Sequence, residues 1–205
     1  SFFRREGRPG ADAILTARLT DRPLRPLFNH DIRNEVQVIM FTMSADMENP
    51  LDVLAINAAS SALMISDIPW GGPVGAVRVG RVNGEFIINP TYTQIDESDL
   101  DLRIAGTADA ILMVESGSNE IDEESMIAAL QYGHDAIQPI IETQLQMARE
   151  IGKPKREVQL FTMDESLVEK VSNRIAEEIN QALDAPHTKH ELQDAIDALK
   201  ENVVV

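Results

Sequence analysis

Hydrophobic residues change their spacing several times along the chain, and each change predicts a new element. Residues 36–42 are almost all β-branched or apolar, which predicts a buried strand. Apolar residues then recur at near-helical spacing up to Ile65, so we expect a helix that starts at Pro50 with Asn49 as its cap. A strand followed by a helix therefore opens the predicted fold.

Two antiparallel pairs of strands are predicted next. Residues 75–82 alternate small or apolar with polar side chains, and Asn83-Gly84 is a strong signal for a two-residue hairpin turn before residues 85–88. Residues 100–105 and 110–115 flank a short turn containing glycine and form the second predicted pair.

The pattern becomes helical again from Asp122 to about Gly152, and we expect Pro139 to kink or break this run. The resulting order, β-α-β-β-β-β-α, is typical of an α+β domain with helices layered on a sheet. After a small basic linker, Asp164 is expected to cap the first of two short amphipathic helices with acidic outer faces. Because such helices cannot bury their apolar stripes alone, they need partners.

Composition narrows the class of protein. With 43% of its 205 residues hydrophobic, the chain can bury a substantial core, which excludes a disordered protein. It has no cysteine, which excludes disulfides, thiolate metal sites and a cysteine nucleophile, and which fits a cytoplasmic location. No apolar run approaches the roughly 18 residues of a membrane span, so we expect no membrane association.

The net charge of −16 argues against a nucleic-acid partner until its distribution is considered. Residues 1–35 hold seven arginines and five acids, a local balance of +2, which leaves −18 for the remaining 170 residues. The first lysine is Lys153, so all the early positive charge is arginine. Arginine pairs bidentately with phosphate and stacks on bases, which suits RNA.

The basic stretch begins with two aromatic residues beside two arginines, Phe2-Phe3-Arg4-Arg5, and is closed by Gly7, Pro9 and Gly10. Flat stacking surfaces next to guanidinium groups bind single-stranded nucleic acid without reading its sequence. On residue types alone, however, apolar anchors with solvated charges remain the more frequent interpretation of a short basic patch.

A resemblance to a known family changes this balance. The matching segments resemble the first ribonuclease PH-like domain of the polynucleotide phosphorylase family; they are residues 2–9, 17–28, 34–38, 57–63, 72–80, 100–102, 105–107 and 110–116. The resemblance implies an α+β, ribonuclease PH-like (ribosomal protein S5 domain 2-like) fold over residues 1–157, without the N-terminal strands that the family places before Phe2. It also implies the start of an all-helical linker domain over residues 158–205.

The family degrades RNA from its 3′ end with inorganic phosphate as the acceptor, and it can run in reverse as a polymerase. The resemblance implies that the intact protein is a homotrimeric phosphorolytic exoribonuclease of mRNA degradation. Its Mg²⁺ and phosphate would bind outside this segment, in a second ribonuclease PH-like domain. We therefore expect this segment to have no catalytic residue, no metal site and no enzymatic activity by itself. We also expect it to bind single-stranded RNA and to contact RNA-degradation proteins.

By the same resemblance, Phe2, Phe3, Arg4, Arg5 and Arg8 line the central opening of the ring and guide RNA inward. Arg18 and Arg22 are expected to contact RNA nearer the active centre of the other domain. The alternative for these two is a structural Arg–Asp network that involves Asp21.

Other polar groups are weaker candidates. Asn57, Ser60 and Ser61 occupy the position where the family's catalytic domain holds phosphate, and we interpret them as a vestigial site that serves packing. The acidic residues 96–101 are expected to form a solvated turn rather than a metal cluster. His187 and His190 lack a third ligand and are interpreted as surface residues.

Two alternatives remain open from the sequence. One is that the segment itself phosphorolyses RNA. The other is a structural, ring-forming scaffold module with no RNA role of its own, which contacts other proteins through its acidic helices.

Overall fold

A computed structural model describes residues 9–203 of the chain. The chain divides into two compact units, Ser1–Gln159 and Leu160–Val205. Each unit is described by itself below.

The first unit is built on a four-stranded antiparallel sheet with the strand order β2-β1-β3-β4. The hairpin predicted at Asn83-Gly84 is confirmed: both residues have positive φ, at 53° and 82°, as the tight turn between β1 and β2 requires. The second predicted pair is confirmed as β3 and β4. The strand bounds are β1 Gly75–Val82, β2 Glu85–Ile88, β3 Leu100–Gly106 and β4 Ile111–Ser118.

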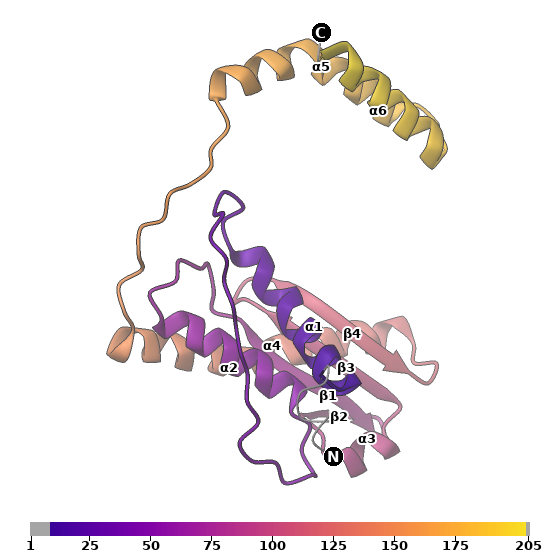
Figure 1. The fold of residues 1–205 in the computed structure, drawn as a ribbon. Coiled ribbons are helices and arrows are strands. Elements are labelled where there is room, and N and C mark those ends of the chain that lie inside the picture. The colour runs from indigo at the N-terminus through magenta and orange to yellow at the C-terminus, as the bar shows by residue number, and fades with distance from the viewer. Residues whose placement is uncertain (1–8, 204–205) are drawn as a thin grey trace. The chain divides into compact units, whose positions relative to one another are not determined.

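Helices cover both faces of this sheet and make three layers, as Figure 1 shows. Helices α1 (Ala11–Leu24) and α2 (Asp52–Ile65) pack on one face, where Leu19, Ile56 and Leu63 are buried in one cluster with the sheet residues Ala76, Ala105 and Met113. Helix α4 (Glu123–Ile151) covers the other face, where Ile137 and Ile141 meet Val77, Val79 and Leu102. The short helix α3 (Tyr92–Glu97) starts with a capping box formed by Thr91 and Gln94.

Two details of the expected helices are wrong. Asn49 does not cap α2, because its side chain donates to Asp46 and the helix starts three residues later, after Leu51. Of the two outcomes expected at Pro139, a kink or a break, the break is wrong, because α4 continues on both sides of the residue. Residue 139 is exposed, so the proline ring faces solvent. Helix α1 was not expected from the sequence at all.

The strand expected at residues 36–42 is also wrong. Residues 35–46 form no ladder within the described part of the chain, and their apolar side chains are exposed, with Phe41 at 80%. A strand needs a neighbour for its backbone N–H and C=O groups, and high β-propensity does not supply one.

The second unit contains the two amphipathic helices that the sequence predicts, α5 (Glu165–Asp184) and α6 (Lys189–Val203), which pack on each other. Asp164 caps α5 as expected, because its carboxylate accepts the N–H of Ser166 at 2.9 Å. No described residue of either helix is fully buried.

Candidate nucleic-acid interface

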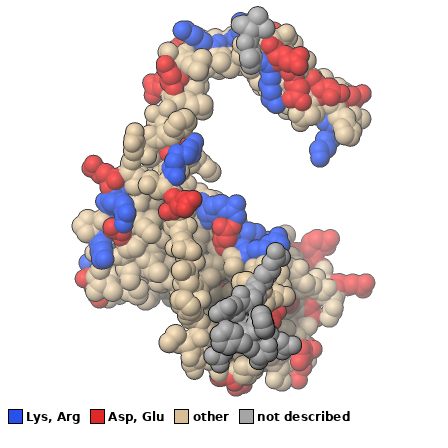
Figure 2. All heavy atoms as spheres, in the orientation of Figure 1, with Lys and Arg blue, Asp and Glu red and all other residues tan. Residues whose placement is uncertain are grey.

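Helix α1 carries the arginines that the described structure contributes to the basic N-terminal stretch. Arg18 and Arg22 lie one turn apart on its exposed side, and Arg25 follows in a 3₁₀ turn, Arg25–Leu27. Figure 2 shows basic side chains gathered along this region of the first unit, with acidic side chains beside them. The expected RNA-gripping residues Phe2, Phe3, Arg4, Arg5 and Arg8 lie outside the described residues.

Asp21 does not form the network that the sequence left open as an alternative for Arg18 and Arg22. It pairs instead with Arg25, through both oxygens of its carboxylate. Arg22 pairs with Glu115 of β4, and Arg18 has no ion-pair partner within residues 9–203. The Arg22 side chain is 48% exposed and that of Arg25 is 73% exposed, so both guanidinium groups remain accessible.

Beneath Arg22 lies a row of charged side chains on the sheet face that α1 and α2 cover. Arg78, Arg103 and Glu115 stand opposite one another on three neighbouring strands. Two like charges directly opposite each other repel, and carboxylates offset this: Arg78 binds Asp101 bidentately at 2.6 and 2.7 Å, and Arg103 donates to Asp52 at 2.6 Å.

Burial makes this row a structural element. The Arg78 side chain is 7% exposed, and a buried cation is tolerated only when it is paired and hydrogen-bonded. Burial lowers the pKa of Arg103, but its hydrogen bond to Asp52 and the charges of Asp101, Asp52 and Glu115 outweigh burial, and the pKa lies above its ordinary value. Glu115 thus stands between the half-buried cation Arg103 and the exposed cation Arg22.

These ion pairs were not predicted from the sequence, although the sequence contains a signal for part of them. Arg78, Asp101 and Arg103 interrupt apolar strands at alternate positions, so they must share a face with the buried Ala76 and Ala105. The partner on β4, Glu115, has no such local signal, because it lies 93 positions from Arg22.

The polar residues of α2 serve packing. Asn57 exchanges two hydrogen bonds of 2.8 Å with the backbone of Ala76, and the Ser60 hydroxyl binds Gln144 and the N–H of Val74. The Ser61 hydroxyl donates to the carbonyl of Asn57, one turn earlier. Asn57 thus joins α2 to β1, Ser60 joins it to α4 and to Val74, and all three side chains have protein partners.

Among residues 9–203, no group of three or more His, Asp or Glu side chains could hold a metal ion. The acids Asp52 and Asp101 share the partners Arg78 and Arg103. The expected solvated turn at residues 96–101 is partly wrong, because Asp99 pairs with Arg81 at 2.7 Å and Asp101 with Arg78.

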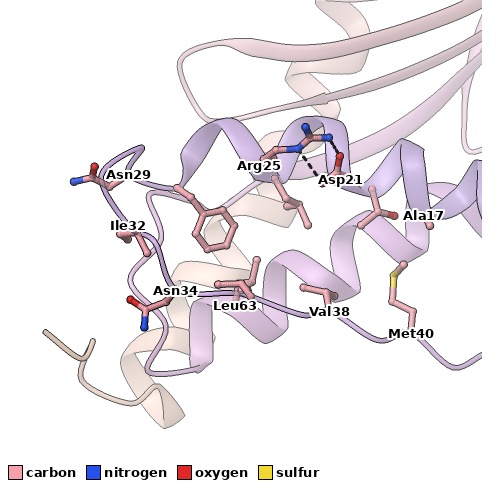
Figure 3. Close-up of a pocket in the computed structure, with 13 residues that line it drawn as sticks. Ala17, Asp21, Arg25, Asn29, Ile32, Asn34, Val38, Met40 and Leu63 are labelled. Carbon is pink, nitrogen blue, oxygen red and sulfur yellow. Dashed lines mark hydrogen bonds and ion pairs between the residues drawn. The ribbon is translucent and has the colours of Figure 1, made fainter. Parts of the chain in front are cut away.

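A cavity of about 410 Å³ opens between α1, α2 and the extended chain after residue 33. Figure 3 shows Ala17 and Asp21 of α1, Leu63 of α2, and Val38 and Met40 of the extended segment around it. Its lining is mainly apolar. The residues expected to form a strand are therefore one wall of an open apolar groove.

The antiparallel sheet with helices on both faces is an α+β domain, and two family models assign it to the ribonuclease PH-like class. The model of the 3′ exoribonuclease family, domain 1, matches residues 1–69, and the model of domain 2 of the same family matches residues 72–136. The chain belongs to the 3′ exoribonuclease family.

The relatives in this family carry a consistent name. A polyribonucleotide nucleotidyltransferase of Thermus thermophilus is 56% identical over 169 residues, which is 82% of this chain and 23% of that protein. Those of Thermomicrobium roseum and Bacillus subtilis are 50% and 46% identical over 203 residues, 99% of this chain, and it covers 26% and 29% of them. The chain therefore spans about a quarter of the length of these curated relatives.

The crystal structure of rice Rrp46 gives a TM-score of 0.46 at 18% identity, over 50% of each chain, a likeness too low to bear on the assignment. Within residues 9–203, no helix has the length and apolar character that a membrane crossing requires.

Proposed function

We propose that this chain is the RNA-binding, non-catalytic first ribonuclease PH-like domain of a phosphate-dependent 3′-to-5′ exoribonuclease, a polyribonucleotide nucleotidyltransferase of mRNA degradation in the cytoplasm. Phe2, Phe3, Arg4, Arg5 and Arg8 would grip single-stranded RNA, and Arg18 and Arg22 would contact it further along. The intact protein would be a homotrimer that meets other RNA-degradation proteins, with Mg²⁺ and phosphate held outside this segment.

The observation that carries the proposal is the accessibility of the arginines on α1. Arg18 and Arg22 are exposed on one side of a helix that directly follows the aromatic and basic stretch. A row of guanidinium groups on a solvent-facing helix is suited to backbone phosphates, and adjacent aromatic rings are suited to bases. The name of the relatives, polyribonucleotide nucleotidyltransferase, fits a polyribonucleotide as the bound polymer.

Binding of labelled oligo(A) to the intact trimer, measured over a series of salt concentrations, tests this role. Replacing Arg4 and Arg5 by alanine together should weaken binding and flatten the salt dependence, by about 0.7 in slope for each phosphate that is no longer neutralised. Unchanged affinity would favour the scaffold alternative.

The non-catalytic part of the proposal needs a separate experiment. The purified 205-residue chain, given oligo(A), Mg²⁺ and inorganic phosphate, should release no nucleoside diphosphate, whereas the intact protein should. Phosphate-dependent release by the chain alone would show that the segment is an enzyme in its own right.

A further inference from the structure

A hollow of about 530 Å³ lies on the surface of the first unit where α1 ends. Its lining includes Arg22 and Arg25 and, from the turn that follows, Phe28, Asn29 and His30. Phe28 is held in place by its packing on Trp70, with ring centroids 6.2 Å apart, and Trp70 in turn donates to the carbonyl of Leu24 at 2.9 Å. The hollow thus combines two guanidinium groups with a fixed aromatic wall.

Each guanidinium group at this hollow already has a carboxylate partner. Arg22 is paired with Glu115, and Arg25 with Asp21, the pair drawn with dashed lines in Figure 3. Both acids are 47% exposed, so their charges are solvated and their ion pairs are weak. An incoming phosphate can therefore replace either carboxylate at little cost, because the exposed acid returns to water.

Glu115 would not lose all of its cationic surroundings when Arg22 turns to another anion. It stands opposite Arg103 on the neighbouring strand, and its charge contributes to the raised pKa of Arg103. Arg103 itself is fixed by Asp52 at 2.6 Å. The sheet therefore keeps a cation beside Glu115 while Arg22 moves.

We propose that the hollow is a subsite for backbone phosphates of single-stranded RNA, where phosphate displaces Glu115 from Arg22 and Asp21 from Arg25. This inference rests on the proposed function and adds Arg25, Phe28 and His30 to the RNA path. The two carboxylates compete with RNA for the arginines and so weaken the binding of RNA at the subsite. The RNA strand is therefore bound only weakly there and can move on. A domain along which an RNA strand moves needs such weak binding at each contact.

Removing one counter-charge at a time tests the subsite. In the 205-residue chain, Glu115→Gln and Asp21→Asn should each tighten binding of fluorescent oligo(A) by about two- to fivefold, because RNA no longer has to break an exposed ion pair. Each variant should also steepen the salt dependence by about 0.7 in slope, because the freed arginine now releases a phosphate counterion on binding. Arg22→Gln added to Glu115→Gln should abolish the gain of the latter.

Asp67→Asn is the matched control. It frees Arg156 from a bidentate pair of similar exposure and changes the net charge by the same amount, but neither Asp67 nor Arg156 lines the hollow. An equal gain in affinity in this variant would show that the effect comes from net charge alone, and it would overturn the subsite. So would unchanged or weaker binding after Glu115→Gln, or no measurable oligo(A) binding at low salt by any of the variants.

Two further arms separate other outcomes. Titration with inorganic phosphate alone, followed through the Nε–H NMR signals of Arg22 and Arg25, should give only weak shifts; tight binding would make free phosphate the ligand and overturn the RNA assignment. Arg4→Ala with Arg5→Ala serves as a reference for the proposed function. If this variant binds oligo(A) like wild type while Glu115→Gln still tightens binding, the RNA-binding role proposed for Arg4 and Arg5 is refuted and the subsite is supported.

Discussion

Ser60 shows how a residue type that suggests chemistry can be used for structure. It is completely buried, and its hydroxyl donates to Gln144 at 2.6 Å and accepts the N–H of Val74 at 2.9 Å. Gln144 donates in turn to the carbonyl of Val74 at 2.9 Å. The ring of three bonds joins α2, α4 and the chain that enters β1, and every buried side-chain polar atom of the described residues has a partner.

Ser60→Ala should therefore cost about 1–3 kcal/mol of unfolding free energy, because it leaves the Val74 N–H and the Gln144 oxygen buried without a partner. Urea unfolding with an unchanged dependence on denaturant would measure the loss. Ser61→Ala is the control, since its hydroxyl only adds a bond to the carbonyl of Asn57 within the same helix, and we expect a change below about 0.5 kcal/mol. Equal losses in the two variants would contradict the ring.

Asp46 provides a pH prediction at the same scale. The backbone N–H groups of Asn49 and Glu48 donate to its carboxylate, and they lower the pKa of Asp46 from 3.8 to about 2. Because the folded value is the lower one, the stabilisation is fully present above the unfolded pKa and is lost as the pH falls toward 2. A carboxyl carbon NMR titration should give a midpoint near 2 for Asp46; a midpoint near 3.8 in the folded chain would refute the turn.

Among the elements, α4 and the sheet lie in close contact at Gly133. A Cβ atom at this position would lie 2.7 Å from Cγ2 of Ile104 and 3.0 Å from Cγ2 of Val79. Glycine weakens a helix by about 1 kcal/mol relative to alanine, so its presence in the middle of α4 reflects the lack of space.

We predict that Gly133→Ala lowers the unfolding free energy by about 1 kcal/mol, because overpacking of about 1–3 kcal/mol exceeds the gain in helix propensity. Thermal unfolding followed by circular dichroism would measure it. Gly117→Ala in β4 offers a contrast, since no heavy atom lies within 4 Å of its added Cβ, and it should be neutral. A stabilised Gly133→Ala variant would mean that α4 can move away from the sheet without loss.

Element by element, the sequence predicted those structures that local patterns specify. The hairpin at Asn83-Gly84, the second strand pair and the long helix α4 follow from turn chemistry and periodicity. Helix α1 escaped prediction because its stripe is interrupted by charged residues and ends at Pro23, and its packing on α2 through Leu19 and Leu24 is a tertiary contact. The strand predicted at residues 36–42 is wrong for the opposite reason. The segment has a local preference for a strand, but it has no neighbouring strand to pair with in the described structure.

The candidate interface was predictable in residue type but not in pairing. The concentration of arginine at one end of the chain indicated Arg18 and Arg22 as candidates. The structure adds that both are exposed on α1. The sequence neighbour Asp21 was the natural partner to consider, yet Glu115, which pairs with Arg22, comes from a strand far along the chain. Ion pairs between distant elements depend on the fold, and local reasoning does not reach them.

At the scale of the whole molecule, the segment that connects the two units has two parts that differ in structure. Its first part is fastened to the end of α2: the ammonium group of Lys155 donates to the carbonyls of Leu63 and Ser66 at 2.8 and 2.9 Å, and Arg156 binds Asp67. Partial burial lowers the pKa of Lys155. Residues 157–163 then form no helix and no extended ladder, and Phe161 is 60% exposed.

This contrast between a fastened and an extended stretch predicts where proteases act. Chymotrypsin should cut the chain first at Phe161 and at Phe41, the exposed aromatic residues of the two segments outside the layers, because proteolysis needs a locally unfolded backbone. Trypsin should cut slowly after Arg156, only a few residues away, and Lys155→Ala should accelerate that cut several-fold by releasing the connection from α2. Mass spectrometry of early digests would identify both products. A first chymotryptic cut inside α4, or a tryptic rate at Arg156 that Lys155→Ala leaves unchanged, would contradict the fastening of this segment to α2.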